Sequence, residues 1–298
     1  MQRLVANLGL LLAAAIWGGG FIAQSQGMLY LGLGWLTCLR FALAFAVVAP
    51  LGIVEAKRAE SRLGFSHFYR SGIIPLGLTF TAATLLQQKA FETTSVTHVG
   101  FLTGLYVIFV PCIEALALKR PPHPLIWLAA LLALYGTWLL GGGFDSLKRG
   151  DFLSIGAAAT FAVQIILMER FVQRTGRPIA AALFQSLCSV VAGGMLGLIA
   201  GPITLATVVK TTPELLYAGI FSGGIAFVLQ AVCQRFTSAT EAAVMLMAES
   251  LFAALFAWML LNESLPPSGW TGCTLIFLSL IMAQGGPMLF RRAEAKNV

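Results

Sequence analysis

The chain has 298 residues, of which 58% are hydrophobic and only 10% are charged. Soluble domains carry about 25% charged residues, so this composition excludes a soluble globular protein. It indicates a chain that is built into a membrane.

Ten segments of the sequence are long and apolar enough to span a bilayer, which takes about 20 predominantly apolar residues. In the first half they are 5–25, 33–54, 71–89, 97–118 and 124–143. In the second half they are 151–171, 178–201, 213–233, 240–261 and 267–289. The longest hydrophilic stretch between them runs from Glu55 to Arg70. We therefore expect an all-α membrane protein with ten transmembrane helices and no inserted soluble domain.

The two halves of the chain resemble each other. A shift of 143 positions lays Leu86 and Gln87 over Leu229 and Gln230, and Trp127 over Trp270. This predicts two repeats, 1–145 and 146–298. Since each repeat has five spans, the second enters the membrane from the opposite side, and we expect two inverted five-helix repeats around a central cavity. Cleavage of the first span as a signal peptide is the alternative, but it would break this repeat.

The basic residues predict the orientation. Of the 19 Lys and Arg residues, 14 fall on the side of both predicted termini and four on the other, while Arg40 lies within a span. The positive-inside rule puts both termini in the cytoplasm. The net charge of +7 is therefore a topology signal, and we expect no nucleic-acid partner.

Glu249 is the ionisable residue that lies deepest in a predicted span. Such residues are costly in a bilayer and often functional. Under the shift of 143 its counterpart is Tyr106, which also lies near the middle of a span, with Thr103 one helical turn away on the same face. Glu249 is expected to bind a substrate ammonium or to titrate with protons. A hydrogen-bonded structural glutamate is the alternative.

Aromatic and amide side chains accompany Glu249 at similar depth. Trp17 and its counterpart Phe161 lie near mid-span, with Gln164 one turn from Phe161. Aromatic faces attract both cations and apolar groups, so these residues suit a small zwitterion or a lipophilic cation, although ordinary helix packing also explains each ring. Gln87 and Gln230 lie toward opposite ends of their spans, as gate residues or as interhelical hydrogen-bonding groups. Arg40 is expected to pair with an acid or to extend outward along its stem, and a structural role is favoured over a functional one.

Several other chemistries find no support in the sequence. The five cysteines fall in apolar runs without metal-ligand spacing, and no GxxxxGK[ST], GxSxG or HExxH motif occurs. We expect no enzyme activity, no metal and no cofactor. A membrane enzyme for lipid-linked substrates would want clustered acids, histidine or serine near one interface, and these are lacking. A non-transporting scaffold or receptor would not need an inverted repeat.

Three segments carry a resemblance to a known family. They are AAAIWGGGF at 13–21, TSVTHVGFLTGLYVIFVPCIEALAL at 94–118 and TSATEAAVMLMAESLFAALFAWMLLNESL at 237–265. Through them the chain resembles the ten-helix EamA branch of the drug/metabolite transporter superfamily. The resemblance implies a bacterial inner-membrane exporter of amino acids, with the aromatic amino-acid exporters as the nearest type. It also implies a central cavity, whose helices would carry Trp17, Phe80, Gln87, Thr103, Tyr106, Gln164, Phe227, Gln230 and Glu249.

The sequence thus leads to one hypothesis and one close rival. We expect a multi-pass inner-membrane transporter that exports small amphipathic metabolites, amino acids above all, by alternating access. The rival is proton-coupled efflux of lipophilic organic cations at Glu249. The expected partners are the small-molecule substrate and the lipid bilayer, and the sequence does not indicate an oligomeric state.

Overall fold

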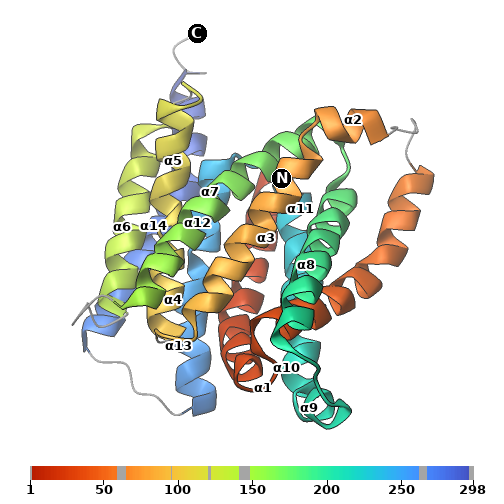
Figure 1. Ribbon diagram of the computed structural model, residues 1–298. Coiled ribbons are helices and arrows are strands. Elements are labelled where there is room, and N and C mark those ends of the chain that lie inside the picture. Colours follow the sequence, from red (N-terminus) through yellow and green to blue (C-terminus); the bar gives the residue numbers. More distant parts are fainter. Residues whose placement is uncertain are drawn as a thin grey trace.

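The computed structural model describes residues 2–58, 65–94, 96–119, 122–140, 148–261 and 267–294, and the regular structure within these residues is helical (Figure 1). The helices of the first half are α1 (Gln2–Arg58), α2 (Phe65–Arg70), α3 (Ile73–Ala90), α4 (Val96–Thr103), α5 (Tyr106–Leu116) and α6 (Pro124–Leu140). Those of the second half are α7 (Arg149–Thr175), α8 (Pro178–Ala200), α9 (Leu205–Lys210), α10 (Thr212–Leu216), the π-helix η1 (Tyr217–Ala226), α11 (Phe227–Cys233), α12 (Ala239–Leu246), α13 (Ala248–Leu261) and α14 (Pro267–Glu294).

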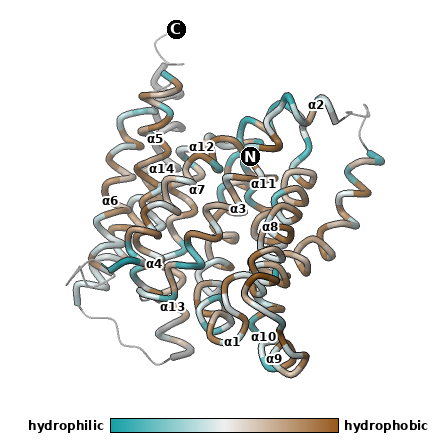
Figure 2. The backbone as a smooth tube through the Cα atoms, in the orientation of Figure 1, coloured by the Kyte–Doolittle hydropathy of each residue, from teal (hydrophilic) through white to brown (hydrophobic). Residues whose placement is uncertain are grey.

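Length and hydropathy make this helical bundle a membrane-embedded, multi-pass protein. Within the described residues, six helical stretches are long and apolar enough to cross a bilayer, and α6 and α14 contain shorter apolar helices. Large apolar side chains face outward, and Ile199 is 80% exposed. Figure 2 shows hydrophobic residues along the helices and hydrophilic ones mainly near helix ends. The count of ten spans stays a prediction, and the predicted boundary between residues 145 and 146 lies outside the described residues.

The first two predicted spans form one element, α1, that is broken at Gly32. Gly32 has φ 65° and ψ 178°, a conformation that glycine adopts without the steric cost of a Cβ atom. The chain turns at this point, so that the parts of α1 before and after Gly32 run in opposite senses (Figure 1). The start of α1 and the end of α14 lie at the same end of the bundle, which we call the terminus end.

The fourth and ninth predicted spans are each broken near the middle. The sequence predicted that Thr103 and Tyr106 share one continuous helix face, but α4 ends at Thr103 and α5 begins at Tyr106. A tighter bond from the Val107 N–H to the Gly104 carbonyl, 3.0 Å long, replaces the regular α-helical pattern there. The matching break, at Met247, separates α12 from α13.

Small residues bring the helices close together. A Cβ atom on Gly104 would lie 2.5 Å from Cε of Met247, so the two helix breaks touch. A Cβ atom on Gly18 would lie 2.7 Å from the backbone nitrogen of Ala253, and this places α1 directly against α13. Around these contacts, α6 packs along α14, α3 along α7, and α1 along α8 and η1.

Candidate functional site

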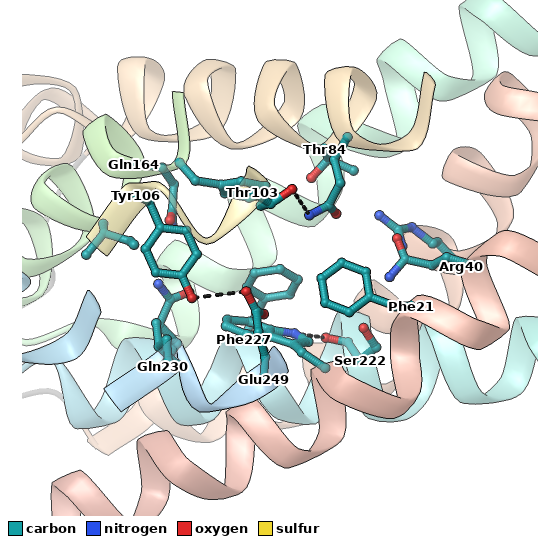
Figure 3. Close-up of a pocket in the computed structure, with 16 residues that line it drawn as sticks. Phe21, Arg40, Thr84, Thr103, Tyr106, Gln164, Ser222, Phe227, Gln230 and Glu249 are labelled. Carbon is teal, nitrogen blue, oxygen red and sulfur yellow. Dashed lines mark hydrogen bonds between the residues drawn. The ribbon is translucent and has the colours of Figure 1, made fainter. Parts of the chain in front are cut away.

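A cavity lies between α1, α3, α4, α5, α7, η1, α11, α12 and α13, and its empty space of about 550 Å³ includes the part that is open to the surroundings. The cavity is lined by Trp17, Phe21, Gln24, Arg40, Thr84, Gln87, Thr103, Tyr106, Phe161, Gln164, Ile165, Ser222, Phe227, Gln230, Leu246 and Glu249. Every sequence-predicted site residue except Phe80 is on this surface. Figure 3 shows the residues pointing inward from helices of both halves.

One end of the cavity is rich in hydrogen-bond acceptors. The Tyr106 hydroxyl donates to Oε1 of Glu249 at 3.0 Å, and both side chains are at least 95% buried. The Gln230 carbonyl oxygen is buried beside them without a hydrogen-bond partner. A buried acceptor without a donor costs free energy. A ligand that brings N–H donors to Glu249 and Gln230 would remove this cost, so this end suits an ammonium group.

Aromatic rings form the walls of the cavity. The Trp17 indole N–H donates to the Ser222 carbonyl at 3.0 Å, and its ring lies 4.7 Å from that of Phe227 between centroids. Ser222 belongs to η1, and π-helical segments leave backbone groups out of the α-helical pattern and often occur at functional sites. The indole N–H thus has a hydrogen-bond acceptor. These contacts fix the rings of Trp17 and Phe227 in the cavity wall, where they offer an apolar surface to a ligand.

Phe80 lies behind the cavity wall rather than on it. It is 1% exposed, and its ring stands nearly perpendicular to that of Phe227 at a centroid distance of 4.6 Å. Phe41 packs edge-on against its other side at 5.3 Å. Phe80 therefore does not line this cavity, and it instead supports the position of the Phe227 ring.

Amide side chains line the remaining surface. Gln87 donates to the Thr103 hydroxyl at 3.3 Å, and Gln164 donates to the Gln185 carbonyl oxygen at the same distance. The sequence predicted Gln87 and Gln230 on opposite sides of the midplane, as gate groups or as interhelical bonds. The structure places both on the surface of the same cavity.

Five polar or aromatic lining residues are absent from the sequence-based set. They are Phe21, Gln24, Arg40, Thr84 and Ser222. Phe21 and Gln24 follow Trp17 at helical spacing, so the face of Trp17 could have indicated them. Thr84 likewise lies one turn before Gln87. Ser222 accepts the Trp17 hydrogen bond through its backbone carbonyl. A pattern of side chains in the sequence does not predict such a backbone contact.

At the terminus end of the bundle, polar contacts join the start of α12 to three other helices. Arg3 of α1 forms an ion pair with Glu241. Glu169 of α7 accepts a hydrogen bond from the Ala239 backbone N–H at 3.1 Å. Glu114 of α5 accepts one from the Thr240 hydroxyl. Among the described residues, no group of three His, Cys, Asp or Glu side chains is placed to hold a metal ion.

The model of the EamA-like transporter family matches this sequence twice, over residues 4–142 and 148–284. Together the matched segments cover most of the chain, and each takes in one of the two halves that resemble each other.

Two named relatives share this similarity over long stretches. An uncharacterized transporter of Archaeoglobus fulgidus is 28% identical over 288 residues, which cover 95% of this chain and 86% of that protein. The uncharacterized transporter YwfM of Bacillus subtilis is 27% identical over 235 residues, which cover 74% of this chain and 77% of that protein. Their names are those of transporters and not of enzymes.

A crystal structure of another protein has the same fold. It superimposes with a TM-score of 0.78 at 19% sequence identity, covering 97% of this chain and 99% of the other. At this identity the match supports the helical arrangement and carries no statement on substrate.

Proposed function

The chain belongs to the EamA-like transporter family, and we propose that it exports small amphipathic metabolites, with amino acids as substrates, across the bacterial inner membrane by alternating access. The observation that carries the proposal is the cavity itself. It combines one buried carboxylate, at Glu249, with aromatic walls and amide groups. In this proposal Glu249 receives the substrate ammonium, while Trp17, Phe161 and Tyr106 pack against the side chain of the substrate.

Contacts between equivalent residues of the two halves support an inverted repeat. Where a two-fold axis relates two halves, a residue close to the axis contacts the equivalent residue of the other half. Tyr106 contacts Glu249, 143 residues away, and Gly104 contacts Met247 with the same separation. The equivalent helices α6 and α14 also pack along each other. These contacts support our proposal of a pseudo-two-fold axis that passes through the helix breaks in the membrane plane.

Such an axis gives the proposed transport cycle its mechanism. Each half can take up the shape that the other half holds, and this exchange moves the opening of the cavity from one membrane face to the other. In this proposal the contacts at the terminus end, among them the ion pair of Arg3 with Glu241, close the cavity on that side. The positive-inside rule puts that closed end in the cytoplasm.

Proton-coupled efflux of lipophilic cations is the second candidate function. The ring faces of Trp17 and Phe227 beside the Glu249 carboxylate favour it, since aromatic faces attract cations. Replacing Glu249 by Gln separates the two candidates. Loss of proton-driven uptake into inverted vesicles, with substrate exchange retained, would favour proton coupling.

Counterflow in proteoliposomes tests the proposed function. Purified protein is reconstituted, and vesicles are preloaded with each of the twenty amino acids or with lipophilic organic cations. We expect labelled substrate to accumulate with one or more amino acids and not in protein-free vesicles. Accumulation of the cations alone would support the second candidate, and no accumulation with any compound would overturn both.

A further inference from the structure

We propose that Arg40 binds the carboxylate of the transported molecule, so that the cavity selects compounds that carry both a carboxylate and an ammonium group. This inference rests on the proposed transport function and assigns Arg40 a direct part in substrate selection. From the sequence, a structural role for Arg40 was favoured over a functional one.

Arg40 is a buried cation whose side chain has no hydrogen bond or ion pair with the described part of the chain. It is 4% exposed, and its Nε atom makes no hydrogen bond. No carboxylate among the described residues forms an ion pair with it. Its guanidinium lies 4.5 Å from the centroid of the Phe41 ring, a contact that supplies some electrostatic attraction but no hydrogen-bond acceptor. Because burying an unpaired charge is costly, this site is suited to a ligand that brings an anion.

Arg40 faces the substrate space and not the membrane surface. A structural arginine in a span commonly extends along its stem until the charged group reaches water. Arg40 instead lines the cavity. Figure 3 shows its guanidinium pointing inward, at the opposite end of the cavity from Tyr106 and Gln230. Arg40 is thus placed to act as a second polar binding group. The aromatic walls lie between it and the end that is rich in hydrogen-bond acceptors.

The charges of the lining favour one class of ligand. Arg40 and Glu249 are the charged members of the described lining, and they carry opposite signs. A zwitterion satisfies both and leaves no net charge in the cavity. A simple cation would leave Arg40 unpaired and add a like charge near it, whereas a multiply charged anion such as a phosphate ester would be repelled by Glu249. A guanidinium also matches the geometry of a carboxylate through two parallel hydrogen bonds.

Transport of paired compounds tests the inference. The probes are phenylalanine with phenethylamine and leucine with isopentylamine, each pair differing only in the carboxylate. Counterflow is measured for the wild type, Arg40→Gln and Arg40→Lys. For Arg40→Gln we expect the half-saturation concentration of the amino acids to rise by about 10-fold or more, while that of the amines rises little or falls. Arg40→Lys, which keeps the charge, should recover part of the loss.

A control variant and a folding measurement separate loss of the Arg40 contact from loss of the folded protein. Arg235→Gln removes the same charge from an exposed position and should leave all four compounds unaffected. Thermal unfolding in detergent shows whether Arg40→Gln is folded. If a folded Arg40→Gln handles the amino acids as the wild type does, or loses amino acids and amines equally, the Arg40 inference is overturned while the transport proposal survives. If the wild type moves none of the four compounds, the transport proposal fails and this inference with it.

Discussion

Tyr106 donates a hydrogen bond to Glu249 over 3.0 Å, and the two residues stand 143 positions apart, which is the shift that overlays the two halves of the chain. In the proposed inverted repeat, this contact joins equivalent positions of the two halves. One half supplies a hydroxyl donor and the other a carboxylate, so the site offers a polar ligand two distinct groups.

Replacing Tyr106 by Phe tests the importance of this hydrogen bond. The variant keeps the ring and loses the hydroxyl, and a hydrogen bond to a charged group is worth about 1.5–3 kcal/mol. We expect the half-saturation concentration for transport to rise about 10-fold or more, with the protein still folded. Tyr135→Phe makes the same change on the exposed face of α6 and should have no effect. Equal behaviour of the two variants would contradict the role of Tyr106.

Replacing Glu249 by Gln removes the carboxylate but keeps its size. Since the substrate ammonium would lose its charged acceptor, we expect counterflow of amino acids to fall about 100-fold, the upper end for a buried charged hydrogen bond. Glu92→Gln is the matched control, because Glu92 forms an exposed pair with Lys89 away from the cavity. Unchanged counterflow in Glu249→Gln would argue that Glu249 is structural.

Adding one methyl group at Gly18 should disturb both stability and transport. A Cβ atom there would lie 2.7 Å from the Ala253 nitrogen and 2.9 Å from the Glu249 carbonyl oxygen. Both are backbone atoms that cannot turn aside, so α13 would have to shift. Gly18→Ala should lower the melting temperature in detergent and reduce counterflow. Gly156→Ala, whose Cβ would meet only a Leu86 methyl at 3.7 Å, should be tolerated, and similar losses in both would refute this packing argument.

Asp151 anchors the first turn of α7 and offers a test away from the cavity. Its carboxylate is fully buried and accepts hydrogen bonds from the Thr94 hydroxyl at 2.5 Å and the Lys148 backbone N–H at 2.7 Å, with His98 Nδ1 at 3.6 Å. Asp151→Asn replaces an acceptor by a donor and should cost about 2 kcal/mol of stability, measured as a lower melting temperature. Substrate affinity of the folded fraction should stay unchanged. A loss of affinity at full stability would contradict this anchoring role.

The apolar segments, and with them the all-helical membrane class, could be predicted from the sequence, because bilayer thickness sets the length of a span. The pairing of Tyr106 with Glu249 could also be anticipated, since internal repetition indicated equivalent positions. The breaks at Gly104 and Met247 could not, because each depends on the other: the Met247 side chain occupies the space that a side chain at position 104 would need.

The cavity lining could be predicted only in part. Helix position indicated depth for Trp17 and Gln164, but depth does not fix which way a side chain faces. Phe80 was expected on the cavity surface and lies behind Phe227. Arg40 was visible as a charge within a span, but its lack of a partner depends on packing by helices distant in the sequence. A buried polar group without a hydrogen-bond partner can be recognised only from the three-dimensional structure.

Accessibility of a single cysteine at position 84 tests alternating access most directly. Thr84 lines the cavity, has no side-chain hydrogen bond to lose among the residues that the structure describes, and is close to cysteine in size. In a variant with the five native cysteines replaced, Thr84→Cys is exposed to a membrane-impermeant thiol reagent in right-side-out and in inverted vesicles. Glu92→Cys, at an exposed position just after the end of α3, is the control and should react from one face only. We predict that Thr84→Cys reacts from both faces and that saturating substrate slows both reactions. Reaction from a single face under every condition, with no protection by substrate, would contradict the account.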